Sequence, residues 1–241
     1  MPVRRSLAAV AVLAAVGLGL SGCLPESGGE EEPSYPALPS AAALPPLNPV
    51  ATGFADSADP GWVQRVSAAS GIPQTALAAY AAAALAKHAE MPGCALPWNT
   101  LAAIGYAESD HGRHAGSALD GNGTAEPPIY GPPLVGQGTD DIPDSDGGAI
   151  DGDASTDRAV GPMQFIPEAW GNWHIDANGD GVEDPQNVFD AAMATANYLC
   201  RAAGEVGDRA GWLRAVAAYN SSVAYANTVA AAAERYAAAA G

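Results

Sequence analysis

The spacing of apolar and polar residues predicts a mainly helical protein with long loops. The first helix is predicted after Pro60, which suits a first helical turn, and it ends at Gly71. Together the predicted helices cover residues 60–70, 75–89, 98–109, 162–173, 189–203 and 211–240. Several of them are rich in Ala, which has the highest helix propensity. Strand signals are too weak to predict a sheet, and no repeat of fixed period is present.

Two segments between the predicted helices lack helical periodicity. Residues 110–160 are rich in Gly, Pro and Asp, and a loop of that length in a compact domain is usually functional or disordered. Residues 176–187 form a second loop, which is acidic and contains two Gly residues. The sequence thus predicts one folded domain over residues 59–241, interrupted by these loops.

The N-terminal residues predict export from the cytoplasm. A basic start, MPVRR, precedes an apolar run over residues 7–20, which is shorter than the roughly 20 residues that span a bilayer. Residues 1–22 are therefore predicted to be a signal peptide. The sequence Leu20-Ser21-Gly22-Cys23 resembles the bacterial lipobox, which places a lipid on Cys23 after cleavage. The alternative is an ordinary secretory signal with an incidental Cys.

Residues 23–58 are rich in Pro, Ser, Gly and Glu and are predicted to be a disordered tether. Together with lipidation of Cys23, this predicts an extracytoplasmic protein anchored to the bacterial membrane. The two remaining cysteines, Cys94 and Cys200, would then meet in an oxidising compartment, where one disulfide is the simplest outcome. Two unpaired buried thiols are the alternative.

The charge of the chain argues against one class of partner. Removal of residues 1–22 leaves eight basic and 27 acidic side chains, a formal charge of −19. Nucleic-acid binding requires a basic surface and is therefore not expected. An acidic chain does suit the binding of cations.

Glu108 stands out among the acidic residues because of where it falls in a predicted helix. It lies seven positions after Leu101 and close to Ile104, on the apolar face. A carboxylate there is costly unless something uses it. One explanation is catalytic, and the other is a buried structural carboxylate paired with an Arg such as Arg158.

The segment DANGDGVED, residues 176–184, has the ligand spacing of a calcium loop. Oxygen ligands fall at positions 1, 3, 5 and 9, with Gly at position 6, as in the first part of an EF-hand. Position 12, a Glu in a full EF-hand, is Asn187 here. The predicted ligands of one structural Ca²⁺ are Asp176, Asn178, Asp180, the carbonyl of Val182, and Asp184. An Asx-rich surface turn without a metal is the alternative.

Three short motifs in order resemble a known enzyme family. Glu108-Ser109 ends an apolar helix, GPMQF follows at residues 161–165, and AYN at residues 218–220. The triple resembles the lytic murein transglycosylases of the lysozyme-like superfamily. The membrane-bound lytic transglycosylase B type, in its short lipoprotein form with a calcium loop, is the most similar. The resemblance extends from about Trp62 to Tyr236 and implies a mainly α, lysozyme-like domain with long loops.

Carried over residue by residue, the resemblance implies a glycan cleft around one acid/base, Glu108. The residues implied to bind peptidoglycan strands are Ser109, Tyr130, Met163, Gln164, Tyr219 and Asn220. Asp157 and Arg158 are expected to brace the long loop. By residue type alone, Tyr219 could equally belong to the core. For Trp170 and Trp173 core packing is favoured over stacking on sugars.

The family's reaction needs one carboxyl group. Glu108 protonates the glycosidic oxygen between N-acetylmuramic acid and N-acetylglucosamine, the C6 hydroxyl of the muramic acid attacks its own C1, and a 1,6-anhydro end forms without water. A first alternative is a muramidase that pairs Glu108 with Asp144, Asp146, Asp151 or Asp153. A second is a non-catalytic lipoprotein that binds the cell wall.

Overall fold

The computed structural model describes residues 34–136 and 141–241, and the predicted signal peptide, Cys23 and the first part of the predicted tether lie outside these ranges. The helices are α1 (Pro60–Ser70), α2 (Gln74–Glu90), α3 (Trp98–Ser109), α4 (Pro167–Trp173), α5 (Val188–Ala203), α6 (Arg209–Tyr219) and α7 (Val223–Ala240), with short 3₁₀ helices at Pro92–Cys94 and His114–Gly116. The prediction of a mainly helical protein is confirmed. In the described part, no helix is long and apolar enough to cross a bilayer.

Side-chain caps and Gly residues set several of the helix ends. Asp59 caps α1, its carboxylate accepting a hydrogen bond from the backbone N–H of Trp62 at 2.7 Å. Asn187 caps α5 in the same way through the N–H of Phe189, at 2.9 Å. Gly71 ends α1 in the left-handed region, with φ 76°. These local signals explain why the predicted bounds of α1 and α5 agree closely with the observed ones.

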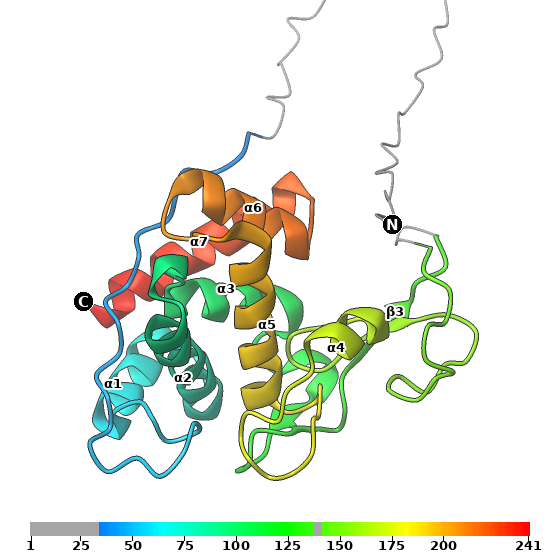
Figure 1. Ribbon diagram of the computed structural model, residues 1–241, viewed down its shortest axis with the longest axis horizontal. Coiled ribbons are helices and arrows are strands. Elements are labelled where there is room, and N and C mark those ends of the chain that lie inside the picture. Colours follow the sequence, from blue (N-terminus) through cyan, green and yellow to red (C-terminus); the bar gives the residue numbers. More distant parts are fainter. Residues whose placement is uncertain (1–33, 137–140) are drawn as a thin grey trace, which may run out of the picture. The chain divides into compact units, whose positions relative to one another are not determined.

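Helix α3 lies at the centre of the domain and carries Glu108 at its C-terminal end (Figure 1). It packs against α7 on one side and α2 on the other, and α2 in turn packs against α5. Trp98, Leu101 and Ile104 of α3 are completely buried. Gly105 lets Tyr80 of α2 approach closely, because a Cβ there would collide with the Tyr80 hydroxyl. The last turn of α3 is thus held on several sides.

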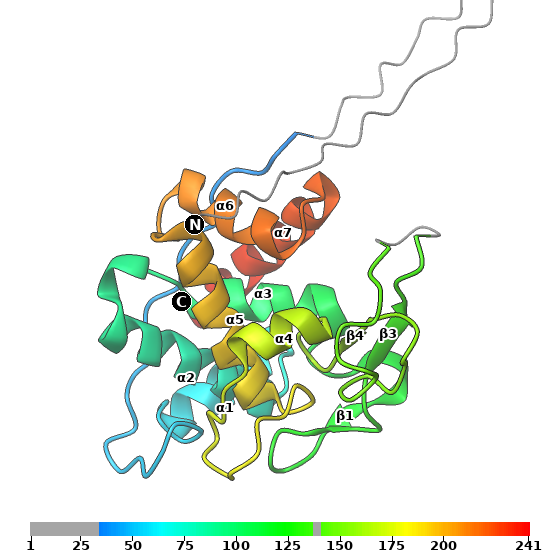
Figure 2. The same cartoon turned by 45° about the vertical axis from the view of Figure 1, so that its right-hand side comes forward.

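The loop after α3 contains short antiparallel strand pairs that the sequence did not predict. Strand β1 (Ala118–Leu119) pairs with β2 (Ala125–Glu126), and β3 (Tyr130–Pro133) pairs with β4 (Arg158–Val160). They lie with α4 on one side of the helices (Figures 1 and 2). Strands of two to four residues give almost no period-two pattern, so their absence from the prediction has a simple cause.

Two predicted helices differ from the observed ones. The segment Gly161–Gln164 forms a tight turn in place of a first helical turn, because Val160 and Phe165 exchange backbone hydrogen bonds around it. The run predicted as one helix over residues 211–240 is broken after Tyr219. There the side chain of Asn220 accepts a hydrogen bond from the N–H of Ser222 at 3.0 Å, and Ser222 caps α7.

Residues 34–58, here called the N-terminal arm, differ from the predicted disordered tether. The arm packs along the helices. The side chain of the fully buried Asn99 accepts a hydrogen bond from the Ala42 N–H and donates to the carbonyls of Ser40 and Ala233. The carboxylate of Glu234 accepts hydrogen bonds from Ser40. Polar side chains on α3 and α7 therefore hold a segment whose own composition predicts no core.

The predicted disulfide is present. Cys94, before α3, is bonded to Cys200 near the end of α5, with Cα atoms 5.5 Å apart. Both residues are buried. The bond closes a loop with a sequence separation of 106 residues and joins the segment before α3 to α5.

Candidate functional site

Glu108 lies in the last turn of α3, at a cavity of about 420 Å³. The lining residues are Tyr106, Ala107, Glu108, Ser109, Asp110, His114 and Thr228. One carboxylate oxygen of Glu108 accepts a 2.5 Å hydrogen bond from the hydroxyl of Tyr225, on α7. Asp110 is the other carboxylate of the cavity, and it forms an ion pair with Arg113 at 2.8 Å. Of the two carboxyl groups among the described residues of the cavity, only that of Glu108 forms no ion pair with another described residue.

The surroundings of Glu108 favour its neutral form. Burial raises the pKa of Glu108 from its usual value near 4.5 to about 7, and the hydrogen bond from Tyr225 opposes part of this rise. The group keeps some exposure to solvent at the cavity. Near neutral pH a substantial fraction of Glu108 therefore carries a proton and can donate it.

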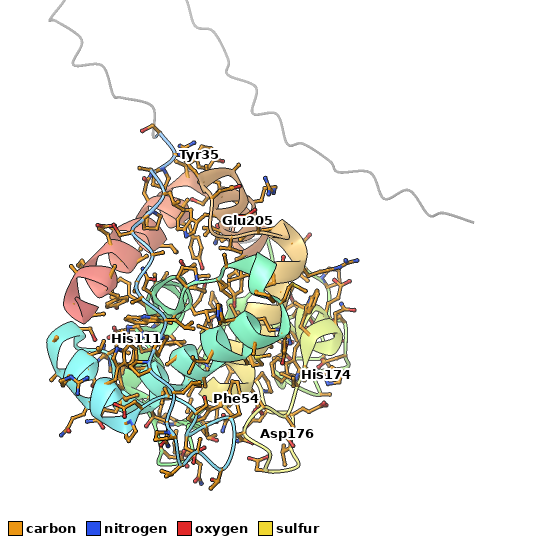
Figure 3. All side chains as sticks on the ribbon, turned by 60° about the vertical axis from the view of Figure 1, so that its left-hand side comes forward. Tyr35, Phe54, His111, His174, Asp176 and Glu205 are labelled. Carbon is orange, nitrogen blue, oxygen red and sulfur yellow. A yellow bond between two sulfur atoms is a disulfide. The ribbon has the colours of Figure 1, made fainter. Side chains whose placement is uncertain are left out.

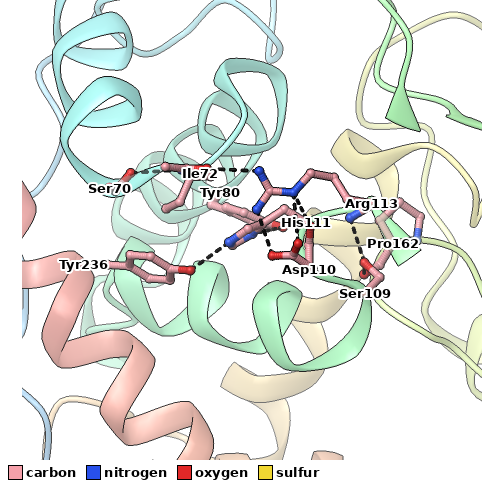
Figure 4. Close-up of polar contacts among 11 residues, drawn as sticks. Ser70, Ile72, Tyr80, Ser109, Asp110, His111, Arg113, Pro162 and Tyr236 are labelled. Atoms are coloured by element: carbon pink, nitrogen blue, oxygen red, sulfur yellow. Dashed lines mark hydrogen bonds and ion pairs between the residues drawn. The ribbon is translucent and has the colours of Figure 1, made fainter. Parts of the chain in front are cut away.

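The chain reverses sharply after α3. Asp110, His111 and Gly112 all have positive φ values, of 51°, 60° and 82°, and the left-handed region costs a non-Gly residue roughly 1–2 kcal/mol. Ser109 secures the reversal: its hydroxyl donates to the Pro162 carbonyl at 2.6 Å and accepts from the Gly112 N–H at 2.8 Å (Figure 4). Ser109, predicted to bind substrate, is buried and connects α3 to the GPMQF turn.

The GPMQF turn is also joined to the end of α6. Met163 is completely buried, and its carbonyl accepts a hydrogen bond from the hydroxyl of Tyr219 at 2.6 Å. Gly161, with φ 78°, is needed because a Cβ there would collide with the Pro185 carbonyl. Burial raises the pKa of Tyr219 well above its usual value, and the nearby charge of Glu108 adds to the effect. Met163 therefore contributes backbone, and its side chain belongs to the core.

Gln164 and Tyr219 line a second cavity, of about 270 Å³, in which Glu108 takes no part. The other lining residues are Leu134, Ile142, Ala159, Phe165, Ile166, Ala169, Tyr198 and Ala218. Tyr130 is 38% exposed beside this region, with the Arg158 guanidinium 5.5 Å from its ring centre. Asn220 is exposed just after α6. The structure divides the predicted binding residues between the two cavities and the surface around them.

The four aspartates considered as partners of Glu108 in a muramidase form hydrogen bonds within the loop that contains them. Asp144, Asp146, Asp151 and Asp153 each accept hydrogen bonds from backbone N–H groups within residues 146–158. None of the four lines the Glu108 cavity. Within the described residues, Asp144 and Asp146 instead form a cluster with the buried Asp157, their carboxylate oxygens within 4.8 Å of one another.

Arg158 is not the partner of Glu108. Its side chain donates to the Gly131 carbonyl at 2.8 Å, and its backbone N–H donates to Asp151 at 2.6 Å. Asp157 accepts two hydrogen bonds from Ser145. Both residues thus brace the long loop, as expected. Trp170 is buried against Phe165, and Trp173 packs edge-on against Tyr198.

The acidic loop that follows α4 is built from turns around carboxylates. Asp176 accepts hydrogen bonds from the N–H groups of Gly179, Asp180 and Gly181, and Val182 is 59% exposed. The loop lies well apart from His111 (Figure 3). Asp190, which is completely buried at the start of α5, accepts hydrogen bonds from the backbone of Ala177, Asn178 and Asp184.

Sequence reasoning missed three residues of these sites: Tyr225, Asp190 and His111. The spacing of Tyr225 within an Ala-rich helix gives no sign that it faces Glu108. Asp190 could have been found from the sequence. The EF-hand pattern requires an acid at position 12, which is Asn187 here, and Asp190 is an acid three residues later. His111 follows the end of a predicted helix, where side chains are usually solvated, but it is only 1% exposed.

Sequence and structure comparisons bear on the family. A search of solved structures finds the Escherichia coli lytic transglycosylase Slt35 in complex with bulgecin A, at 14% identity over 75% of each chain with a TM-score of 0.45. No curated protein sequence matches the chain.

Residues 148–212 match the family model described as the transglycosylase SLT domain. The match includes Met163, Gln164 and the acidic loop, begins after Glu108, and ends before Tyr219. Over these residues the chain carries a transglycosylase SLT domain, the domain of a peptidoglycan lytic transglycosylase enzyme.

Proposed function

We propose that the protein cleaves the β-1,4 bond between N-acetylmuramic acid and N-acetylglucosamine and leaves a 1,6-anhydromuramic end, with Glu108 as the single acid and base. The observation that carries the proposal is the carboxyl group of Glu108, which faces a cavity with its pKa raised to about 7. A carboxyl group with a pKa near the working pH can both give and take a proton.

Among the described residues, the Glu108 cavity has no second carboxylate without a cation, and this supports an intramolecular reaction. Glu108 gives its proton to the glycosidic oxygen as that bond to C1 breaks. The C6 hydroxyl of the same muramic acid forms the new bond to C1 and returns its proton to Glu108. The nucleophile is part of the substrate, so the step gains from proximity. A hydrolase would need a second carboxylate, and Asp110 is already paired with Arg113.

Gln164, Tyr219, Tyr130 and Asn220 are proposed to contact the glycan. The second cavity, with Gln164 and Tyr219 on its wall, has the mixture of aromatic and amide groups that binds sugars. Ser109 and Met163 support the site through buried contacts. The proposed enzyme is of the membrane-bound lytic transglycosylase B type, anchored outside the cytoplasm by a lipid on Cys23.

A structural Ca²⁺ in the acidic loop is also proposed. The donor set of Asp176, Asn178, Asp180, the Val182 carbonyl and Asp184 consists of oxygens alone, which is the chemistry that Ca²⁺ prefers. The buried carboxylate of Asp190 anchors the same loop. The ion would stabilise the start of α5 and has no part in the cleavage.

The test of the reaction is the chemistry of the new ends. Purified glycan strands are digested in ¹⁸O-labelled water, and the muramic ends are analysed by mass spectrometry. Anhydro ends without label are expected, and Glu108→Gln should fold but lose nearly all turnover, since an amide cannot exchange the proton. Asp144→Asn serves as the matched control and should keep its chemistry. Labelled reducing ends would identify a muramidase, and binding without turnover a wall-binding protein.

A further inference from the structure

A buried chain of three polar side chains crosses the end of α3. The imidazole of His111 lies between the Tyr80 hydroxyl, 3.3 Å from Nδ1, and the Tyr236 hydroxyl, 2.8 Å from Nε2 (Figure 4). His111 follows Glu108 by three residues, Tyr80 comes from α2, and Tyr236 comes from α7. Three elements that are distant in the sequence thus meet at one side chain.

Burial favours the neutral form of the His111 imidazole. Burial is the main cause that lowers the pKa of His111, to about 3, and Arg113 adds to it. Burial raises the pKa of Tyr236 to about 12 and that of Tyr80 as well. A neutral ring has one donor and one acceptor nitrogen, so one Tyr donates to it and the other accepts from it. Each of the three side chains thus has a hydrogen-bond partner within the trio.

Helix α7 also contacts the last turn of α3 at Glu108. Tyr225 and Tyr236 both lie on α7, and they contact Glu108 and His111 respectively. The first contact joins the last turn of α3 to α7, and the second joins the left-handed reversal that follows α3, at His111, to the same helix. The reversal alone could relax in more than one way, because its residues lie in a sparsely populated backbone region.

We propose that His111 is a positioning residue, whose hydrogen bonds to Tyr80 and Tyr236 fix the end of α3 so that the Glu108 carboxyl meets the Tyr225 hydroxyl. The proposal rests on the role of Glu108 in the proposed function. It predicts that the contact between His111 and Tyr236 and the contact between Glu108 and Tyr225 are energetically coupled.

Other charged and titratable groups also face His111. Tyr106 of α3 lies with its ring centre 6.0 Å away, and Arg235 of α7 sits over the rings of Tyr106 and Tyr236. Asp110 and Arg113, from its own segment, are paired with each other. Tyr236→Phe keeps the ring under Arg235 and removes the hydroxyl that bonds His111. The same hydroxyl also interacts with the Arg235 side chain, so substitutions of His111 itself are needed to assign the effect to His111.

The test is a double-mutant cycle on the pKa of Glu108, measured by ¹³C NMR titration of its carboxyl and assigned with Glu108→Gln. In the otherwise wild-type protein, Tyr225→Phe should raise this pKa, because the Tyr225 hydrogen bond lowers it. In the Tyr236→Phe background, the same substitution should raise it by clearly less. An equal rise in both backgrounds would overturn the proposal.

Thr100→Val is the matched control. It removes a buried hydrogen bond of α3, from Trp212 on α6 at 3.2 Å, without touching His111. In the Thr100→Val background, Tyr225→Phe should raise the pKa of Glu108 as much as it does in the wild type. A smaller rise here as well would mean that any destabilisation of α3 weakens the contact between Glu108 and Tyr225, and it would contradict the proposal. His111→Gln, which keeps a donor and an acceptor, should restore more of the coupling than His111→Phe.

Activity provides a second readout. Tyr236→Phe should lower kcat for the formation of anhydromuramic ends about ten- to a hundredfold, while KM for the glycan changes little. A small displacement of a catalytic group has effects of that size on kcat. A wild-type protein that is inert on peptidoglycan would refute the proposed function, yet the NMR cycle would still decide the role of His111. A loss of kcat no larger than that of Thr100→Val would count against positioning.

Discussion

The hydroxyl of Tyr225 donates a 2.5 Å hydrogen bond to Oε1 of Glu108, from α7 to the last turn of α3. The bond leaves Oε2 as the oxygen that can hold the catalytic proton. It also ties the acid to a helix that begins only three residues after the AYN motif. Tyr225 therefore orients the carboxyl group and limits the rise of its pKa.

Tyr225→Phe should move the pH dependence of cleavage. The hydrogen bond from Tyr225 lowers the pKa of Glu108, so its removal raises that pKa. Glu108 acts as an acid in its protonated form, and the fall in activity at alkaline pH should shift to higher pH. We expect kcat to drop about tenfold at its optimum from lost orientation. The measurement is kcat against pH, and an unshifted alkaline limb would contradict it.

Glu108→Gln should stabilise the protein at high pH. The folded pKa of about 7 exceeds the usual value near 4.5, so folding favours the protonated acid. That stability is complete below about pH 4.5 and is lost as the pH rises through 7. The shift corresponds to at most about 3 kcal/mol.

Thermal unfolding at pH 5 and pH 8 checks this expectation. The advantage of Glu108→Gln over wild type should be larger at pH 8. The exposed Glu126→Gln, which removes a carboxylate from a surface strand, should show no such trend. An advantage that is the same at both pH values would show that Glu108 is not perturbed by burial.

Replacing both Cys94 and Cys200 with Ser should destabilise the folded state. The bond closes a loop with a sequence separation of 106 residues, for which the chain-entropy model gives about 4–5 kcal/mol, often less in practice. Urea unfolding of the double variant and the wild type measures the difference. In the unreduced, denatured wild type neither Cys should react with a thiol reagent, and labelling of both would disprove the bond.

Added Ca²⁺ should raise the thermal unfolding temperature. A ligand that binds only the folded state stabilises it by about 2.7 kcal/mol at a hundred times its dissociation constant. Asp180→Ala should abolish the rise, whereas Asp153→Ala, in the other acidic loop, should keep it. The absence of a rise in chelated wild-type protein would exclude the site.

The sequence predicts the helices well where Pro, Gly and capping residues mark their ends. It fails where contacts between residues outside the local pattern determine the backbone. At Gly161–Gln164, a pair of backbone hydrogen bonds between Val160 and Phe165 forms a tight turn in place of a helical turn. It also fails for the N-terminal arm, because the polar groups that hold it, Asn99 and Glu234, are far away in the chain. The composition of a segment indicates whether it can form a core of its own, but it does not indicate whether distant residues will hold it against the domain.

The candidate site shows the same division. Glu108 is recognisable because a carboxylate on an apolar helix face conflicts with the local pattern. Tyr225 and His111 conflict with nothing in their own segments, and only the packing of α7 on α3 gives them partners. Motifs in the chain therefore indicate the acid, and the fold supplies the groups that hold it.

The packed N-terminal arm also limits how far the enzyme could work from a membrane. If a lipid is attached at Cys23, ten residues, 24–33, lie between that residue and the arm. A chain of that length spans at most about 40 Å even when fully extended. A free tether over residues 23–58 could span about three times as far. The contacts of Asn99 and Glu234 with the arm would thus shorten the reach of a lipid-anchored protein about threefold compared with a free tether.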